Sequence, residues 1–253
     1  MPKTARTRGE EVFEEYLASL GRKFTYEPNI GRRQPDYLVH RAGGDVLCEI
    51  KDFELNDDDR AELEAIASGR HNAVSSRAIP FNRIQLRIRA ASSQLREYKG
   101  RYPCLVVLFD ASAQVHLIDF TVLGAMYGET QISIPIAHGG EPAGEPSIVF
   151  ERESRYLTRT SNTTVSAVAI LEYTAPNEHL LKDALAQQDF GAGTEGISRA
   201  LKFSYEFGER HPEIFDRLPR LQVFCNVYAA VPWPAEALPG PHDVLWPREQ
   251  AAR

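Results

Sequence analysis

Three residues with chemically useful side chains, Asp36, Glu49 and Lys51, lie within residues 31–52. Asp36 follows a proline and opens one apolar segment, whereas Glu49 and Lys51 close a second one. The glycine pair Gly43–Gly44 between these segments is typical of a tight turn between antiparallel strands. Because side chains alternate between the two faces of a strand, Glu49 and Lys51 would share a face. Antiparallel pairing would bring Asp36 towards them.

Two carboxylates that lie close together raise each other's pKa, and a divalent cation or an ammonium group relieves the repulsion. A site made only of oxygen ligands suits Mg²⁺ or Mn²⁺ rather than Zn²⁺, which prefers His and Cys. The three residues therefore indicate a metal site that engages phosphate oxygens. A surface hairpin with a solvated Glu49–Lys51 pair explains the same residues equally well, because short motifs also match by chance.

The pattern Pro35-Asp36, a gap, and then Glu49-Ile50-Lys51 resembles the signature of the PD-(D/E)XK nuclease superfamily, which has the restriction-endonuclease-like fold. The resemblance covers residues 9–110 and implies an α/β fold with an αβββαβ core, in which helices flank a mixed central sheet. It also implies that Asp36, Glu49 and the Ile50 carbonyl hold Mg²⁺ or Mn²⁺, together with an acid from the first helix. Lys51 would orient or help deprotonate the attacking water and stabilise the phosphate.

The first helix is predicted over Gly9 to Leu20, with Gly21 as a natural end. Its apolar stripe consists of Val12, Phe13, Tyr16, Leu17 and Leu20. Among its four glutamates, Glu10 lies nearest the stripe and Glu14 next. The resemblance places the metal-binding acid at Glu10, whereas the alternative leaves all four glutamates solvated on the surface.

A second amphipathic helix is predicted over Phe81 to Lys99, followed by a buried strand over Cys104 to Asp110. Gln94 and Tyr98 match a Gln-x-x-x-Tyr element that some branches of the superfamily carry on this helix. The resemblance implies that both residues position Lys51 or a phosphate. A glutamine and a tyrosine four residues apart are also common by chance, so the match depends on its place in the chain.

Charge is unevenly distributed along the chain, whose net charge is −6. Residues 52–64 hold seven acids and one base, whereas residues 81–101 hold six bases and one acid. The second helix therefore offers a local basic face to phosphates despite the negative total. We expect Arg83, Arg87 and Lys99 on this face to bind the nucleic-acid backbone.

The polar segment from Asp52 to Ile79 contains only a weak helical pattern, around Arg60 to Ala67. Long irregular connections in compact domains are often lids or binding loops, so we expect a mobile excursion beside the site. Disorder without function explains the composition equally well. A short strand is predicted before the hairpin, over Phe24 to Glu27.

Residues 1–120 are thus predicted to form a nuclease-like core, with 52–80 as an excursion or lid, and 121–253 an α/β extension packing on it. The pattern after the core comprises a strand end and short helix over Leu117 to Gly128, a Gly/Pro loop over His138 to Pro146, strands over Val165 to Tyr173 and Leu221 to Ala230, helices over Glu178 to Gln187 and Glu195 to Arg210, and a Pro-rich tail from Pro232.

Composition is that of an ordinary globular protein, with 43% hydrophobic and 25% charged residues. The longest apolar runs are too short to cross a bilayer and no signal core follows the N-terminus, so we expect a cytoplasmic protein. Cys48, Cys104 and Cys225 are far apart in apolar strands, which predicts buried thiols rather than disulfides or cluster ligands. The seven histidines show no ligand spacing.

The sequence is therefore interpreted as a metal-dependent nuclease that hydrolyses phosphodiester bonds in nucleic acid, with DNA as the expected substrate. One alternative is a non-catalytic nucleic-acid-binding or scaffold protein that keeps the fold, and another is an enzyme acting on small phosphate esters. The sequence leaves open DNA versus RNA, sequence preference, endo versus exo action, and the oligomeric state, a homodimer included.

Overall fold

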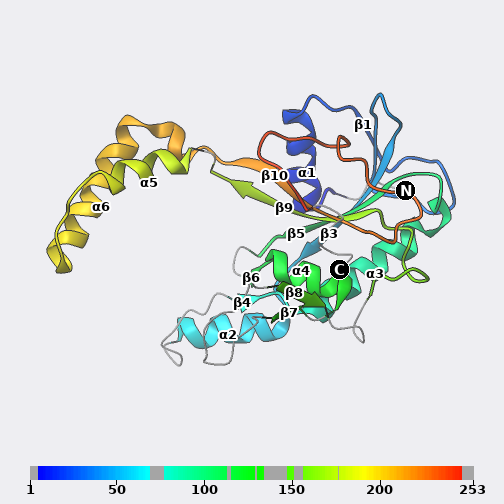
Figure 1. Ribbon diagram of the computed structural model, residues 1–253, viewed down its shortest axis with the longest axis horizontal. Helices are drawn as coiled ribbons and strands as arrows, with labels where there is room; N and C mark the ends of the chain where they lie inside the picture. The colour runs from blue at the N-terminus through cyan, green and yellow to red at the C-terminus, as the bar shows by residue number, and fades with distance from the viewer. Residues whose placement is uncertain are drawn as a thin grey trace. The chain divides into compact units, whose positions relative to one another are not determined.

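The computed structural model describes residues 5–68, 77–112, 115–128, 130–133, 147–150, 156–175 and 177–246 (Figure 1). Its helices are α1 (Arg8–Ser19), α2 (Asp57–Ala67), α3 (Phe81–Leu95), α4 (Asp119–Tyr127), α5 (Glu178–Ala186) and α6 (Gly193–Arg210), with 3₁₀ turns η1 (Arg96–Tyr98) and η2 (Pro212–Phe215). Its strands are β1 (Phe24–Tyr26), β2 (Tyr37–Val39), β3 (Val46–Phe53), β4 (Arg77–Ala78), β5 (Cys104–Asp110), β6 (Val115–His116), β7 (Thr130–Ser133), β8 (Ser147–Phe150), β9 (Ala167–Thr174), β10 (Leu218–Cys225) and β11 (Val244–Trp246).

The main sheet joins seven of the described strands in the order β1-β2-β3-β5-β9-β10-β11. Strands β1, β2 and β3 are antiparallel neighbours, whereas β3, β5 and β9 run parallel, so the sheet is mixed. Helix α1 precedes β1, and α3 connects β3 to β5 after the excursion that contains α2 and β4. The predicted αβββαβ order and the α/β class with a mixed, helix-flanked sheet are confirmed.

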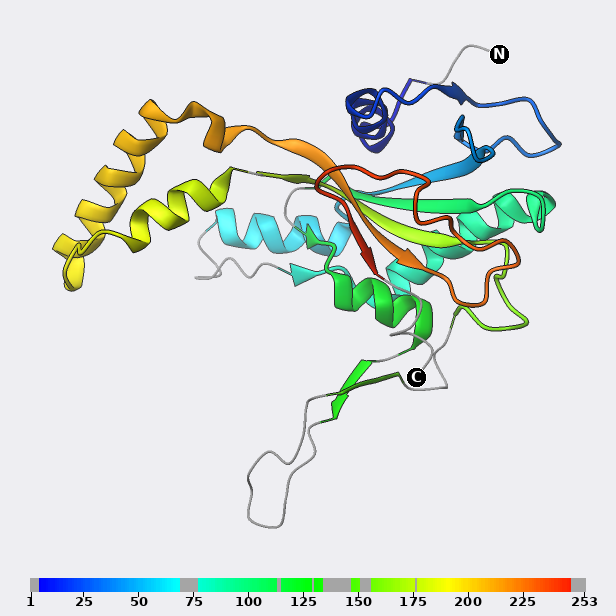
Figure 2. The same cartoon turned by 45° about the horizontal axis from the view of Figure 1, so that its top comes forward.

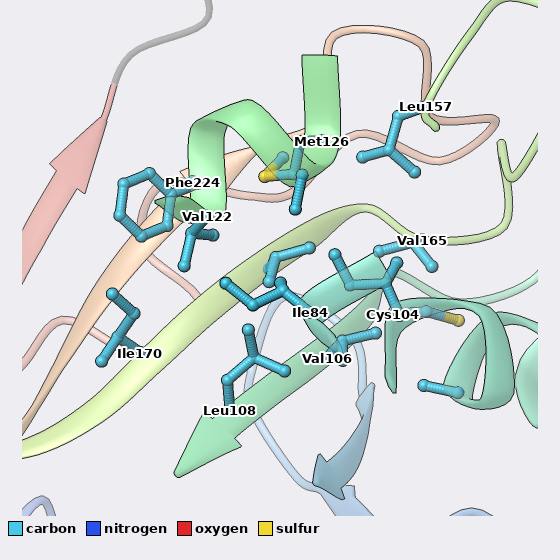
Figure 3. Packing of buried hydrophobic residues seen from close by; sticks show 14 of the residues in the cluster. Ile84, Cys104, Val106, Leu108, Val122, Met126, Leu157, Val165, Ile170 and Phe224 are labelled. Carbon is cyan, nitrogen blue, oxygen red and sulfur yellow. The ribbon is translucent and has the colours of Figure 1, made fainter. Parts of the chain in front are cut away.

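Helices cover both faces of the sheet, with α1 on one side and α3 and α4 on the other (Figure 2). Alternation along the strands supplies both faces with apolar side chains. On the α1 side, the ring of Phe13 meets that of Tyr37 with centroids 5.3 Å apart. On the other side, Ile84 of α3 and Val122 of α4 lie in one buried cluster with Val106 of β5 (Figure 3).

Local chemistry sets several element boundaries. Thr7 caps α1 through a reciprocal pair of hydrogen bonds with Glu10, and Gly21 adopts a left-handed φ of 61° after the helix. Helix α2 starts earlier than predicted, because the side chain of Asn56 accepts the N–H of Asp59 at 2.7 Å and the carboxylate of Asp59 accepts the N–H of Asn56 at 3.0 Å.

Some predictions concern residues that the structure does not describe. The expectation of a mobile segment over 52–79 includes residues 69–76, which lie outside the described residues, and the predicted Gly/Pro loop over 138–146 lies entirely outside them. The antiparallel pair β7–β8 was not predicted.

Cys48, Cys104 and Cys225 are free and buried, as expected. In the described ranges, no helix is long and apolar enough to cross a bilayer.

The chain divides into two compact units, one made of Met1–Leu171 with Leu221–Arg253 and the other of Glu172–Arg220. The predicted boundary at residue 120 does not coincide with this division, because strands of the predicted extension continue the core sheet. The smaller unit contains α5, α6 and η2, and a row of rings within it, Phe190, Phe203, Phe207 and His211, has centroid separations of 4.4–5.9 Å.

Candidate active site

The hairpin of β2 and β3 brings Asp36 and Glu49 together. Tyr37 pairs with Cys48 across the hairpin, so Asp36 stands opposite Glu49. The peptide N–H of Asp36 donates to Glu49 Oε2 at 3.3 Å, and the N–H of Ile50 donates to Asp36 Oδ2 at 2.7 Å. The side chain of Glu49 is fully buried. The predicted convergence of the two carboxylates is therefore observed.

Lys51 completes a three-residue cluster on the same face of β3 as Glu49. Its Nζ lies 2.6 Å from Glu49 Oε1, and 17% of its side chain is exposed. This pair is thus not the solvated surface pair of the alternative reading. An ammonium that reaches solvent beside a buried carboxylate can act on a group that approaches from outside.

Burial disfavours the ionised form of both carboxyl groups. It raises the pKa of Glu49 to about 7, with a further contribution from the charge of Asp36, while Lys51 acts in the opposite direction. Burial likewise raises the pKa of Asp36 to about 6, although the hydrogen bond from Ile50 and the charge of Lys51 lower it. A second positive charge next to this pair would favour the ionised form of both groups.

A stability prediction follows from these pKa values. Because the folded-state pKa of Glu49 lies above its unfolded value of 4.5, the folded protein binds more protons than the unfolded chain between about pH 4.5 and 7. The free energy of unfolding therefore falls as pH rises through this window. We expect Glu49→Gln to be more stable than the wild type near pH 8, by on the order of 1–2 kcal/mol.

Urea unfolding without divalent cations checks this expectation, and the advantage of Glu49→Gln should vanish near pH 4. Glu11→Gln is the matched control, since this glutamate lies on the exposed side of α1 with 53% of its side chain accessible. A Glu49→Gln protein that is less stable than the wild type at both pH values would contradict the proposed cost of ionising Glu49.

Glu10 lies near this cluster but is held by its own helix terminus. It is buried, and its Oε2 accepts the N–H of Thr7 at 2.8 Å while its Oε1 accepts the hydroxyl of Tyr26 at 3.3 Å. Its charge raises the pKa of Asp36. Glu14 instead pairs with Arg6 at 2.6 Å and accepts the hydroxyl of Tyr37. Glu10 therefore acts on the cluster electrostatically, whereas Glu14 is held by Arg6 and Tyr37.

The donor set fits a hard cation held by few protein ligands. Among the described residues, no group of three or more His, Cys, Asp or Glu side chains comes together as a metal cage. Mg²⁺ commonly binds through one or two carboxylates and keeps several waters, and Asp36 and Glu49 offer two such groups. The N–H and C=O of a strand residue point to the same side, so the carbonyl of Ile50 faces the side on which its N–H meets Asp36.

Two further acidic residues near the cluster, Asp52 and Glu27, were not predicted from the sequence. Asp52 Oδ2 accepts the N–H of Gly9 at 3.0 Å, which fastens the start of α1 to β3, and a Cβ on Gly9 would lie only 2.1 Å from Asp52 Oδ1. The N–H of Glu27 donates to the carbonyl of Asp36 at 2.8 Å, and the Glu27 charge raises the pKa of Asp36. Antiparallel pairing of β1 with β2 places Glu27, just after β1, next to Asp36, just before β2. That pairing is the signal that could have indicated Glu27.

Tyr98 acts on the loop before Asp36 rather than on Lys51. Its buried hydroxyl donates to the carbonyl of Arg33, and the neighbouring Glu97 accepts the N–H of Arg33 at 2.7 Å. This fixes the chain just ahead of Asp36. No hydrogen bond within the described ranges joins Gln94 to the cluster, so its predicted role stays a prediction.

The three bases predicted to bind phosphate differ in whether their side chains are already paired or are exposed. Arg83 is engaged, because it donates to Asp59 Oδ2 at 3.0 Å and to the carbonyl of Glu54 at 2.8 Å. Arg87 and Lys99 are exposed. The guanidinium carbon of Arg87 lies 5.8 Å from the ring centroid of Phe53, near the end of β3, and its charge lowers the pKa of Asp52. Arg87 is therefore an exposed base close to the end of the strand that carries Glu49 and Lys51.

No family model matches the chain, and no curated protein matches it. A solved structure of SfsA from Pyrococcus furiosus, in complex with Ca²⁺, aligns with 17% sequence identity and a TM-score of 0.25. The alignment covers 58% of this chain and 61% of the SfsA chain, so this chain spans less than two thirds of that protein.

Proposed function

We propose that this protein is a metal-dependent nuclease of the PD-(D/E)XK superfamily, which hydrolyses phosphodiester bonds in nucleic acid, DNA being the expected substrate. The observation that carries the proposal is the pairing of the half-buried Asp36 with the fully buried Glu49, with Lys51 Nζ 2.6 Å from Glu49, at the open end of the β2–β3 hairpin. Two adjacent carboxylates that are partly or fully withdrawn from water are costly to ionise unless a cation offsets their charge.

Asp36, Glu49 and the Ile50 carbonyl would hold Mg²⁺ or Mn²⁺, and Glu10 would add negative charge nearby. When bound, the ion supplies positive charge to the phosphate oxygens and lowers the pKa of a coordinated water. Asp52 contributes at a distance, since it holds the N-terminus of α1 and with it Glu10.

Lys51 would act on the water and the phosphate. Its ammonium is fixed by Glu49 yet partly exposed, so it can donate a hydrogen bond to an incoming oxygen without losing its ion pair. A preorganised cation placed where negative charge develops stabilises the transition state of phosphoryl transfer. Tyr98 holds the loop that leads to Asp36, so it is a positioning residue in this scheme.

The alternative is a binding or scaffold protein that keeps the fold without turnover. The cost of holding the buried Glu49 next to the half-buried Asp36, which repels it, counts against this alternative, because a pure phosphate binder gains nothing from two adjacent carboxylates. Incubation with duplex, single-stranded and branched DNA and with RNA, in Mg²⁺, Mn²⁺ or EDTA, separates the two functions. Cleavage that requires the metal supports the nuclease, whereas tight binding without cleavage of any substrate supports the alternative.

The salt dependence of binding tests the role of Arg87. In EDTA, where cleavage is suppressed, Arg87→Gln should weaken binding equally across DNA sequences and reduce the slope of log affinity against log salt by about 0.9. Lys202→Gln on α6, whose side chain is 79% exposed, is the matched loss of one positive charge. An unchanged slope for Arg87→Gln would remove this arginine from the proposed backbone contact.

A further inference from the structure

A polar hollow lies at the turn end of the β2–β3 hairpin, away from the carboxylate pair. It has a volume of about 400 Å³ and is lined by Arg41, Gly43, Asp45, Arg101 and Tyr102, together with prolines. Asp45 directly precedes β3 and lies four residues before Glu49, which separates them by roughly 13 Å at 3.3 Å per residue of extended chain. The hollow is therefore distinct from the proposed catalytic cluster.

Arg41 is unusually buried for an arginine with so few partners. Only 8% of its side chain is exposed. One terminal nitrogen lies 3.4 Å from Glu236, whose own side chain is 74% exposed, and the other donates to the carbonyl of Gly43 at 3.1 Å. Its buried Nε has no hydrogen-bond partner among the described residues. A buried guanidinium with one weak, solvent-exposed counter-charge is costly, and an anion in the hollow would offset that cost.

The other residues of the hollow fit the same ligand. Arg101 is exposed and its guanidinium carbon lies 5.7 Å from the ring centroid of Tyr102, so a second cation and an aromatic face border the space. The carboxylate of Asp45 also lines it, but Asp45 is paired with His40 at 3.3 Å. Arginine forks match phosphate oxygens in geometry, and 400 Å³ exceeds what a lone phosphate needs.

We propose that this hollow is a phosphate-binding site in which Arg41 and Arg101 hold the phosphate and Tyr102 supports an attached nucleoside. The phosphate can belong to a free nucleotide or to a nucleic acid. The inference goes beyond the nuclease proposal and does not depend on it, because none of the hollow's residues belongs to the carboxylate cluster.

Titration calorimetry in EDTA tests the site with three probes: inorganic phosphate, adenosine 5′-monophosphate and a 5′-phosphorylated DNA strand. Arg101→Gln and Arg41→Lys should each weaken binding about tenfold, since lysine keeps the charge but loses the planar fork. Asp45→Asn should strengthen binding, because it removes a negative charge from the lining. Arg210→Gln, an exposed arginine of α6, should leave binding unchanged.

The pattern among the probes identifies the source of the phosphate. Weakened binding of the mononucleotide indicates a free nucleotide, and weakened binding of the DNA strand alone indicates a nucleic-acid phosphate. Arg101 is exposed and Asp45 is about one-third exposed, so their variants keep the test valid if Arg41→Lys fails to fold. The proposal is overturned if the wild type binds none of the probes, or if Arg101→Gln and Asp45→Asn bind all three as the wild type does.

Discussion

Asp36→Asn and Glu49→Gln are each expected to lower Mg²⁺-dependent cleavage of DNA by at least about 10³-fold, equivalent to roughly 4 kcal/mol of transition-state stabilisation. Each variant removes one of the two carboxylates that converge at the hairpin end, with the Asp36 N–H 3.3 Å from Glu49 Oε2. Single-turnover cleavage measures the effect directly, because it excludes product release.

The same two variants should bind DNA as tightly as the wild type, or more tightly, because each removes negative charge from the site proposed to receive the phosphate. Glu11→Gln provides the control for cleavage, since this exposed glutamate pairs only with Arg8 on the surface of α1 among its described contacts. Cleavage that persists in Asp36→Asn and needs no metal would overturn the mechanism.

Lys51→Met should lower the rate of cleavage by about 10²–10³-fold, while the metal still binds. In the proposed mechanism the lysine acts on water and phosphate, whereas the metal ligands are oxygens of other residues. Loss of the ammonium also removes the charge that lowers the pKa of Glu49, so the pKa of Glu49 should rise further. Metal affinity should therefore fall at neutral pH and recover at higher pH, where Glu49 ionises again.

Mn²⁺ binding followed by electron paramagnetic resonance across a pH series checks this separation of roles. Lys202→Met, at an exposed position of α6, controls for the loss of a lysine. If Lys51→Met abolished metal binding at every pH, the lysine would be a structural requirement of the site rather than a participant in the reaction.

Most of the fold prediction rests on hydrophobic periodicity and on turn residues. The apolar stripe of α1, the stripe of α3, the glycine turn before β3 and the apolar run of β5 are local signals, and each predicted element is present. Helix α2 began earlier than predicted because the Asn56–Asp59 capping pair is a stronger start signal than the weak apolar pattern that follows.

The site was only partly predictable, for a physical reason. Strand alternation and hairpin pairing are enough to bring Asp36, Glu49 and Lys51 together. The contact between Asp52 and Gly9, 43 residues apart, depends on how α1 packs on the sheet, which no local pattern specifies. Likewise, the sequence could not show that the hydroxyl of Tyr98 reaches Arg33 or that Arg83 is held by Asp59.

The most direct test of the central claim is anomalous diffraction from crystals soaked in Mn²⁺. The account predicts an ion coordinated by the carboxylates of Asp36 and Glu49, with the carbonyl of Ile50 as a third protein ligand and waters completing the shell. Asp36→Asn crystals should lose this ion under the same soak. Wild-type crystals that show no ion between Asp36 and Glu49, from a protein that cleaves DNA in Mn²⁺, would contradict the account.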